Sequence, residues 1–176
     1  MLISCNNHPT GVVVKDSENV SEDKTAPYVE GNKNIMRREN EEMQMFISRY
    51  GFQMERSGTG LYYKIIDEGV GKTFVEGDRV TMKYSTFLLS GEKIYDSDSL
   101  GIKSFIVNRS EEIDALHEIS HKLRKNASAI LVIPSYLAYG VAGDGDKIAG
   151  LQPLVMTVSV VDNSKYNQIS HIVNFD

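Results

Sequence analysis

The stretch Ile-Pro-Ser-Tyr-Leu-Ala-Tyr-Gly at residues 133–140 decides how this chain is expected to fold. The apolar run before it, residues 129–133, is typical of a buried strand, and Pro134 ends that strand because it has no N–H for the ladder. Gly140 then begins a loop rich in Gly and Asp. Tyr139, on this turn, offers a flat apolar face and one hydroxyl, which suits a shallow binding pocket, although it could also simply cap the core.

Further short motifs precede this stretch in a fixed order. Gly-Asp-Arg-Val at residues 77–80 leads into Tyr84, and Gly-Glu-Lys-Ile-Tyr-Asp-Ser occupies residues 91–97. Together with residues 133–140, these motifs resemble the FKBP-type peptidyl-prolyl cis-trans isomerases. The resemblance covers about residues 60–162, so we expect the isomerase domain there.

The periodicity of the rest of this region predicts an α+β domain. Strands are expected at residues 61–66, 79–89, 103–107, 129–133 and 153–161, and a helix at residues 111–124 with Ser110 as its N-cap. The family resemblance implies the same class in a particular form. In that form a curled antiparallel sheet wraps on one short helix, and this chain adds an amphipathic helix before it.

The resemblance also implies a site and a reaction. An apolar pocket would grip a proline ring of a polypeptide client and remove water from the preceding amide, without a cofactor or a metal. The Tyr139 hydroxyl and the Ile113 backbone N–H would bind substrate carbonyls, and Asp96 would make a polar contact at the rim. The residues implied for this site are Tyr84, Tyr95, Asp96, Phe105, Ile113, Leu116, Tyr139 and Met156.

Several positions depart from the family pattern. Leu116 replaces the Trp that many members use as the pocket floor, Tyr95 replaces a Phe, and Met156 replaces an aromatic residue. Ile-Ala-Gly at residues 148–150 stands where the family has Ile-Pro-Pro, which predicts a looser loop because Gly adds backbone freedom. An alternative is therefore a binding or chaperone module with weak catalysis or none.

The N-terminal region predicts attachment to a membrane. Leu-Ile-Ser-Cys at residues 2–5 resembles a bacterial lipobox, with Cys5 as the lipidated residue, and the remainder of residues 1–34 is polar and resembles a flexible tether. This predicts a lipoprotein that faces the periplasm of a gram-negative bacterium and helps extracytoplasmic proteins to fold. The other interpretation is a chance match with a free thiol. The net charge of −5, without a Lys/Arg cluster, gives no reason to expect nucleic acid.

A helix is predicted for residues 35–50, within a linker region that ends at residue 59. Met36, Met43 and Phe46 recur at helical spacing, and charged residues such as Glu39 are assigned to the opposite side. The helix could pack on its own domain or form a homodimer. Its position resembles that in the gliding-motility-associated FKBP lipoproteins. Residues 163–176 form an extension with no assigned role.

A competing motif lies in the predicted helix at residues 111–124. His117, Glu118 and His121 fit the H-E-x-x-H pattern of zinc peptidases, in which two His one helical turn apart bind the metal. A third ligand lacks motif support, because no Glu follows Glu118 in the sequence. Helical geometry puts both His well around from the centre of the buried stripe, and the family resemblance implies flank or surface positions for them, so a zinc metallopeptidase is the less favoured alternative.

Overall fold

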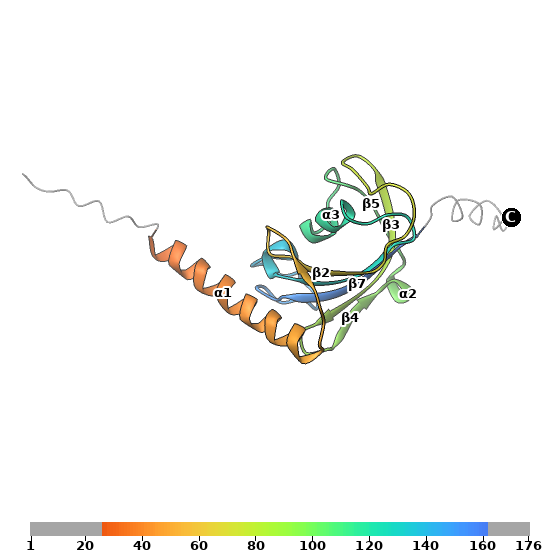
Figure 1. The fold of residues 1–176 in the computed structure, drawn as a ribbon. Coiled ribbons are helices and arrows are strands. Elements are labelled where there is room, and N and C mark those ends of the chain that lie inside the picture. The colour runs from red at the N-terminus through yellow and green to blue at the C-terminus, as the bar shows by residue number, and fades with distance from the viewer. Residues whose placement is uncertain (1–25, 162–176) are drawn as a thin grey trace, which may run out of the picture.

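The fold is an antiparallel sheet that curls around one short helix (Figure 1), seen here in a computed structural model that describes residues 26–161. The strands are β1 (Glu55–Arg56), β2 (Tyr62–Asp67), β3 (Arg79–Leu88), β4 (Lys93–Asp96), β5 (Lys103–Ile106), β6 (Ser128–Ile133) and β7 (Leu154–Val160). The helices are α1 (Ala26–Arg49), α2 (Ser97–Leu100) and α3 (Asp114–Ser120), with a 3-10 turn η1 (Ser135–Leu137). The predicted α+β class is confirmed.

The long strand β3 organises the sheet. The strand order is β1-β2-β6-β7-β3-β4, and β3 pairs with β7 along one edge. Its other edge pairs with β5 at residues 79–82 and with β4 at residues 85–87. Strands β5 and β4 thus follow one another along the same edge of β3.

The two faces of the sheet carry separate hydrophobic clusters, because successive strand residues point to opposite sides. The main cluster lies between the sheet and α3, and the smaller one lies under α1 (Figure 1). Residues that are adjacent in the chain therefore belong to different clusters. Tyr63, Leu131 and Met156 face α3, whereas their neighbours Tyr62, Val132 and Val155 face α1.

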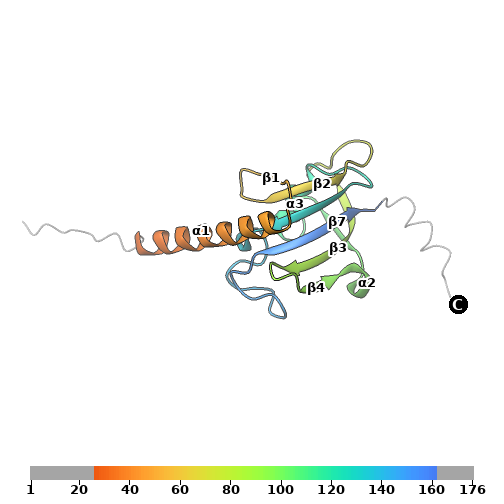
Figure 2. The same ribbon diagram turned by 60° about the horizontal axis from the view of Figure 1, so that its bottom comes forward.

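Helix α1 packs on its own domain through its C-terminal half, by way of Met43 and Phe46. It begins at Ala26, so the predicted tether is wrong over residues 26–34. Pro27 is tolerated because it lies in the first turn, where a missing N–H costs no helical hydrogen bond. The helix projects beyond the sheet at its N-terminal end (Figure 2). The predicted homodimer stays a prediction.

The assignment of Glu39 to the polar side of α1 is wrong. Glu39, Met43 and Phe46 are four and three residues apart, so they share one face, and Glu39 is only 4% exposed. Met36, which was predicted to lie on the apolar side, is half exposed instead. A charged side chain therefore occupies the buried face of the helix.

Helix α3 is shorter than predicted and has a different N-cap. It covers Asp114–Ser120, and Ile113 occupies the N-cap position without a side-chain hydrogen bond. The Ser110 hydroxyl instead accepts from the Ile106 N–H at 3.0 Å and donates to the Ile106 carbonyl at 3.1 Å. Ser110 thus closes a turn after β5, a local hydrogen-bonding choice that competes with helix capping.

No helix within residues 26–161 is both long and apolar enough to cross a membrane. Cys5, the rest of the predicted tether before residue 26 and the extension at residues 163–176 lie outside the described residues.

Candidate functional site

The fold brings seven of the eight predicted site residues into one apolar cluster beneath α3. Tyr84 and Met156 come from the adjacent strands β3 and β7, and Leu116 lies fully buried on α3. The partly buried rings of Tyr95 and Tyr139 pack against this cluster from outside. The seven residues are Tyr84, Tyr95, Phe105, Ile113, Leu116, Tyr139 and Met156.

Tyr139 is held by a tight turn at residues 134–140, here termed the Tyr139 turn. Pro134 has a φ of −66° and an extended ψ, which ends β6, and its carbonyl accepts from the Leu137 N–H at 3.0 Å. Burial raises the pKa of the Tyr139 hydroxyl above its ordinary value, an effect that nearby Lys103 partly opposes. The hydroxyl is therefore a neutral hydrogen-bond donor at physiological pH.

Tyr95 fastens the loop at residues 141–150 to the rim of the cluster. Its hydroxyl donates to the Asp144 carboxylate at 2.5 Å and lies 3.2 Å from an oxygen of Asp146, while the Lys147 ammonium lies 5.4 Å from the ring centroid. The hydrogen bond to Asp144 raises the pKa of Tyr95 well above its ordinary value. A Phe at this position would have no hydroxyl to make these contacts.

The same loop is closed on itself by hydrogen bonds, and the loosening predicted at residues 148–150 stays a prediction. The Asp144 carboxylate accepts from the N–H groups of Asp146 and Ile148, at 2.9 and 2.8 Å. Gly150 serves a close approach, because a Cβ there would overlap the Val141 carbonyl. Desolvation raises the pKa of Asp144, but the hydrogen bonds from Tyr95 and the backbone outweigh it, so the pKa lies below its ordinary value.

The carboxylate of Asp96, the eighth predicted residue, is turned to α2. One oxygen accepts from the Ser99 N–H at 2.8 Å, which makes Asp96 the N-cap of α2, and the other lies 3.3 Å from the Lys93 ammonium. The Ser99 backbone N–H is the main cause that lowers the pKa of Asp96. Its carboxylate is therefore already bound within the protein.

Sequence reasoning missed an ion pair beside the pocket, between Lys103 and Glu112. Their charged groups lie 2.8 Å apart, and the Lys103 ammonium lies 5.2 Å from the centroid of the Tyr84 ring. The second Glu112 oxygen accepts from the Ile113 N–H at 3.0 Å, the group predicted to bind a substrate carbonyl. One signal was available: Lys103 lies two residues before Phe105 in β5, hence on the same face.

The two histidines of the H-E-x-x-H motif make hydrogen bonds within the protein. His117 is buried, so the prediction of a flank or surface position is wrong for it; its ring meets Phe105 edge-on. Nδ1 of His117 accepts from the Asn108 N–H at 3.0 Å, and Nε2 lies 3.1 Å from the Ser110 carbonyl. His121 is bonded through both ring nitrogens to Asn108 and Phe74. Residues 26–161 hold no group of three potential metal ligands.

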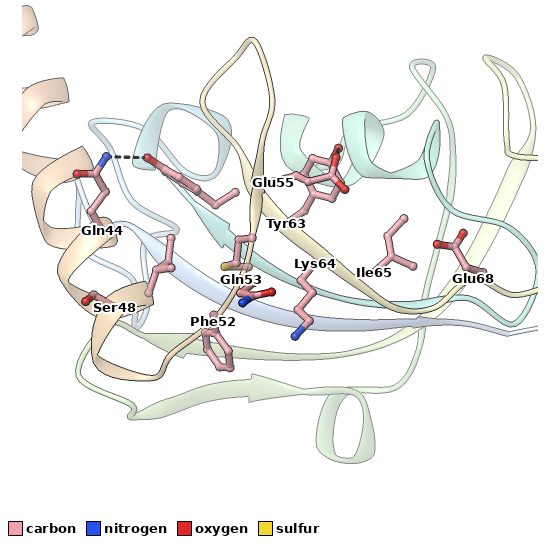
Figure 3. Close-up of a pocket in the computed structure, with 12 residues that line it drawn as sticks. Gln44, Ser48, Phe52, Gln53, Glu55, Tyr63, Lys64, Ile65 and Glu68 are labelled. Carbon is pink, nitrogen blue, oxygen red and sulfur yellow. Dashed lines mark hydrogen bonds between the residues drawn. The ribbon is translucent and has the colours of Figure 1, made fainter.

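A hollow of about 640 Å³ lies beside strand β2, near the end of α1 (Figure 3). It opens between the end of α1, the segment that follows and strand β2, and a hydrogen bond from Gln44 to Tyr62 marks one end. It includes Tyr63 but none of the eight predicted site residues. The candidate site therefore remains the cluster beneath α3.

Comparison with known proteins identifies the family. The family described as FKBP-type peptidyl-prolyl cis-trans isomerase matches residues 71–161, which is more than half of the chain. The chain therefore belongs to this family.

Bacterial relatives match a little under two thirds of the chain. The chain is 33% identical over 108 residues to the probable FKBP-type peptidyl-prolyl cis-trans isomerase FkpA of Neisseria meningitidis serogroup B, covering 61% of this chain and 39% of that protein. It is 28% identical over 107 residues to the outer membrane protein MIP of Legionella longbeachae, covering 61% of this chain and 46% of that protein. The chain thus spans less than half the length of these relatives.

Solved structures agree with this assignment. The crystal structure of FkpA from Escherichia coli has a TM-score of 0.62 and 25% identity, covering 79% of this chain and 65% of that chain. The crystal structure of AtFKBP13 has a TM-score of 0.57 and 23% identity, covering 63% of this chain and 98% of that chain, and supports the fold alone.

Proposed function

We propose that this protein is a peptidyl-prolyl cis-trans isomerase that acts on proline-containing polypeptide clients. The observation that carries the proposal is that the seven predicted pocket residues all belong to the main apolar cluster or pack against it, with the partly buried Tyr139 ring at its edge. These residues come from five strands and helices and the Tyr139 turn, yet they meet beneath α3. Family membership adds the reaction class.

The proposed mechanism is non-covalent. An X-Pro bond rotates slowly because twisting removes the amide resonance, at about 18–20 kcal/mol. The apolar cluster would hold the proline ring and exclude water from the amide, which favours the less polar twisted form. A hydrogen bond from Tyr139 to a substrate carbonyl that flanks the X-Pro amide would hold the twisted backbone geometry more tightly than the planar one, which is differential binding of the transition state.

The change Tyr139→Phe tests this mechanism, because it removes only the hydroxyl. The loss of one hydrogen bond costs about 0.5–1.5 kcal/mol, so we expect the catalysed rate to fall roughly two- to tenfold. The rate is measured as cis-trans exchange of a short X-Pro peptide by NMR. Tyr50→Phe, on an exposed ring at the end of α1, is the matched control and should leave the rate unchanged. An inactive wild-type protein would refute the proposal.

A second candidate is a binding or chaperone module of the same fold with weak catalysis. One observation favours it: the Ile113 N–H, proposed to receive a substrate carbonyl, already donates to Glu112. The Lys103 ammonium holds the other oxygen of Glu112 in place. A client would therefore have to displace a carboxylate that is fixed at two points.

The change Glu112→Ala tests whether the Ile113 N–H receives a substrate carbonyl, because it frees that N–H. Under the isomerase proposal, kcat/KM for a neutral X-Pro peptide should rise, by about two- to tenfold if one competing hydrogen bond is removed. Glu111→Ala, on the adjacent exposed carboxylate, is the control. An unchanged rate in a folded Glu112→Ala protein would mean that the Ile113 N–H does not take part.

We also propose that the chain is a periplasmic lipoprotein and folding helper, anchored through Cys5. The lipobox-like residues 2–5 support this, and a relative named as an outer membrane protein is consistent with it. Expressed behind a signal peptide in a gram-negative host, the wild-type protein should fractionate with membranes and Cys5→Ser should not, since acyl chains supply the membrane affinity. Equal partitioning of both proteins would contradict the anchor.

A further inference from the structure

We infer that Glu39 of α1 is a positioning residue for the isomerase site, acting through the Tyr139 turn. This inference rests on the proposed function, because it assigns Glu39 a role through the Tyr139 hydroxyl. Glu39 lies outside residues 71–161, the region that matches the family. A helix that precedes the family domain therefore supplies part of the site.

The contact itself is made by a buried carboxylate. Glu39 is 4% exposed, and its Oε2 accepts from the Ser135 N–H at 2.9 Å while its Oε1 accepts from the Ser135 hydroxyl at 2.6 Å. Ser135 is itself buried. Burial of a carboxylate is unfavourable unless hydrogen bonds compensate it, and the two hydrogen bonds from Ser135 supply that compensation.

Ser135 in turn organises the Tyr139 turn. Its carbonyl accepts from the Ala138 N–H at 2.9 Å and from the Gly140 N–H at 2.8 Å. These two N–H groups belong to the residues on either side of Tyr139. The three polar groups of Ser135 are thus all engaged: two fix it to α1, and the third fixes the backbone that carries Tyr139.

Other contacts of α1 hold the helix in place and so support the link from Glu39 to the Tyr139 turn. Met43 and Phe46, on the same face as Glu39, anchor the helix in the cluster with Tyr62, Val132 and Val155. The Tyr136 hydroxyl donates to the Thr59 carbonyl at 2.7 Å. The turn is therefore fixed both to the helix and to the segment after β1, and of these two contacts only the one to the helix involves a charge.

The first test compares Glu39→Gln with Glu42→Gln in the full chain. Gln has the shape of Glu and can still contact the Ser135 N–H and hydroxyl, but both hydrogen bonds become neutral and therefore weaker than those to a carboxylate. We expect kcat/KM for a short X-Pro peptide to fall roughly three- to tenfold for Glu39→Gln. Glu42 is solvent-exposed on the same helix, and its variant should match the wild type.

A double-mutant cycle with Tyr139→Phe tells positioning from general stabilisation. A positioning residue acts through the hydroxyl, so Glu39→Gln should have little further effect once Tyr139 is Phe, because coupled residues are not additive. Independent, additive losses would overturn the inference while leaving the proposed function intact. If Tyr139→Phe alone leaves the rate unchanged, the proposed role of Tyr139 and this inference are both wrong.

Hydrogen exchange gives a readout that does not depend on catalysis. The Ala138 and Gly140 amides donate to the Ser135 carbonyl, so releasing Ser135 should speed their exchange. We expect faster exchange at both amides in Glu39→Gln and no change in Glu42→Gln, with the amides of β7 unaffected in both. Unchanged exchange at Ala138 and Gly140 would overturn the inference, whatever the activity of the wild type.

Discussion

Replacing Leu116 with alanine should lower the free energy of unfolding by about 2–5 kcal/mol. Leu116 is fully buried on α3, where it meets the strand residues of the main cluster. Shortening the side chain removes transfer free energy and leaves a cavity, because the surrounding sheet is hydrogen-bonded and cannot collapse onto the gap. Unfolding in denaturant, followed by circular dichroism, measures the change.

Leu100→Ala is the matched control for this prediction. Leu100 lies on α2 and is 62% exposed, so the same substitution there should change the free energy of unfolding by less than about 0.5 kcal/mol. A loss below about 1 kcal/mol for Leu116→Ala would contradict its place as the packed floor of the site.

The second large effect is expected for Gly143→Ala in the loop at residues 141–150. Gly143 has a φ of 70°, and a Cβ there would overlap the Ile148 carbonyl and the Ala149 backbone. The substitution adds left-handed strain to a steric overlap, at about 1–3 kcal/mol for each. The loop should open, releasing Asp144 from Tyr95, and exchange of the Ile148 and Leu151 amides should become faster.

Gly145→Ala controls for the left-handed strain alone. Gly145 lies in the same loop with a φ of 78°, but a Cβ there would meet no atom within 4 Å. It should therefore cost about 1–2 kcal/mol, the price of the backbone conformation, and should leave the bond between Tyr95 and Asp144 in place. Equal effects of the two substitutions would show that the overlap at Gly143 is relieved without opening the loop.

Sequence predicted the elements whose signal is local. The strand expected at residues 79–89 is observed at Arg79–Leu88. Pro134 ends β6 as predicted, because the missing N–H acts at its own position. These features depend on the residue itself and its immediate neighbours.

The features that were missed depend on partners far away in the chain. Glu39 was placed on the polar face because it is charged, yet its partner Ser135 lies 96 residues later. The partner of Tyr95, Asp144, lies 49 residues later. The glycines of the loop indicate flexibility when they are considered alone, so they do not predict that the loop is closed by hydrogen bonds. For α3, Ser110 offered a good cap, but a competing bond to Ile106 uses its hydroxyl.

The N-terminal half of α1 projects beyond the sheet as a straight extension of a helix that is fixed to the domain (Figures 1 and 2). A helix of 24 residues is about 36 Å long at 1.5 Å per residue. The Glu39 carboxylate and the apolar contacts of Met43 and Phe46 fix both the rotation and the tilt of this helix. The helix is therefore a rigid spacer and not a flexible linker. An attachment at the N-terminal end of α1 would therefore set the direction in which the pocket faces, as well as the distance between the pocket and the attachment point.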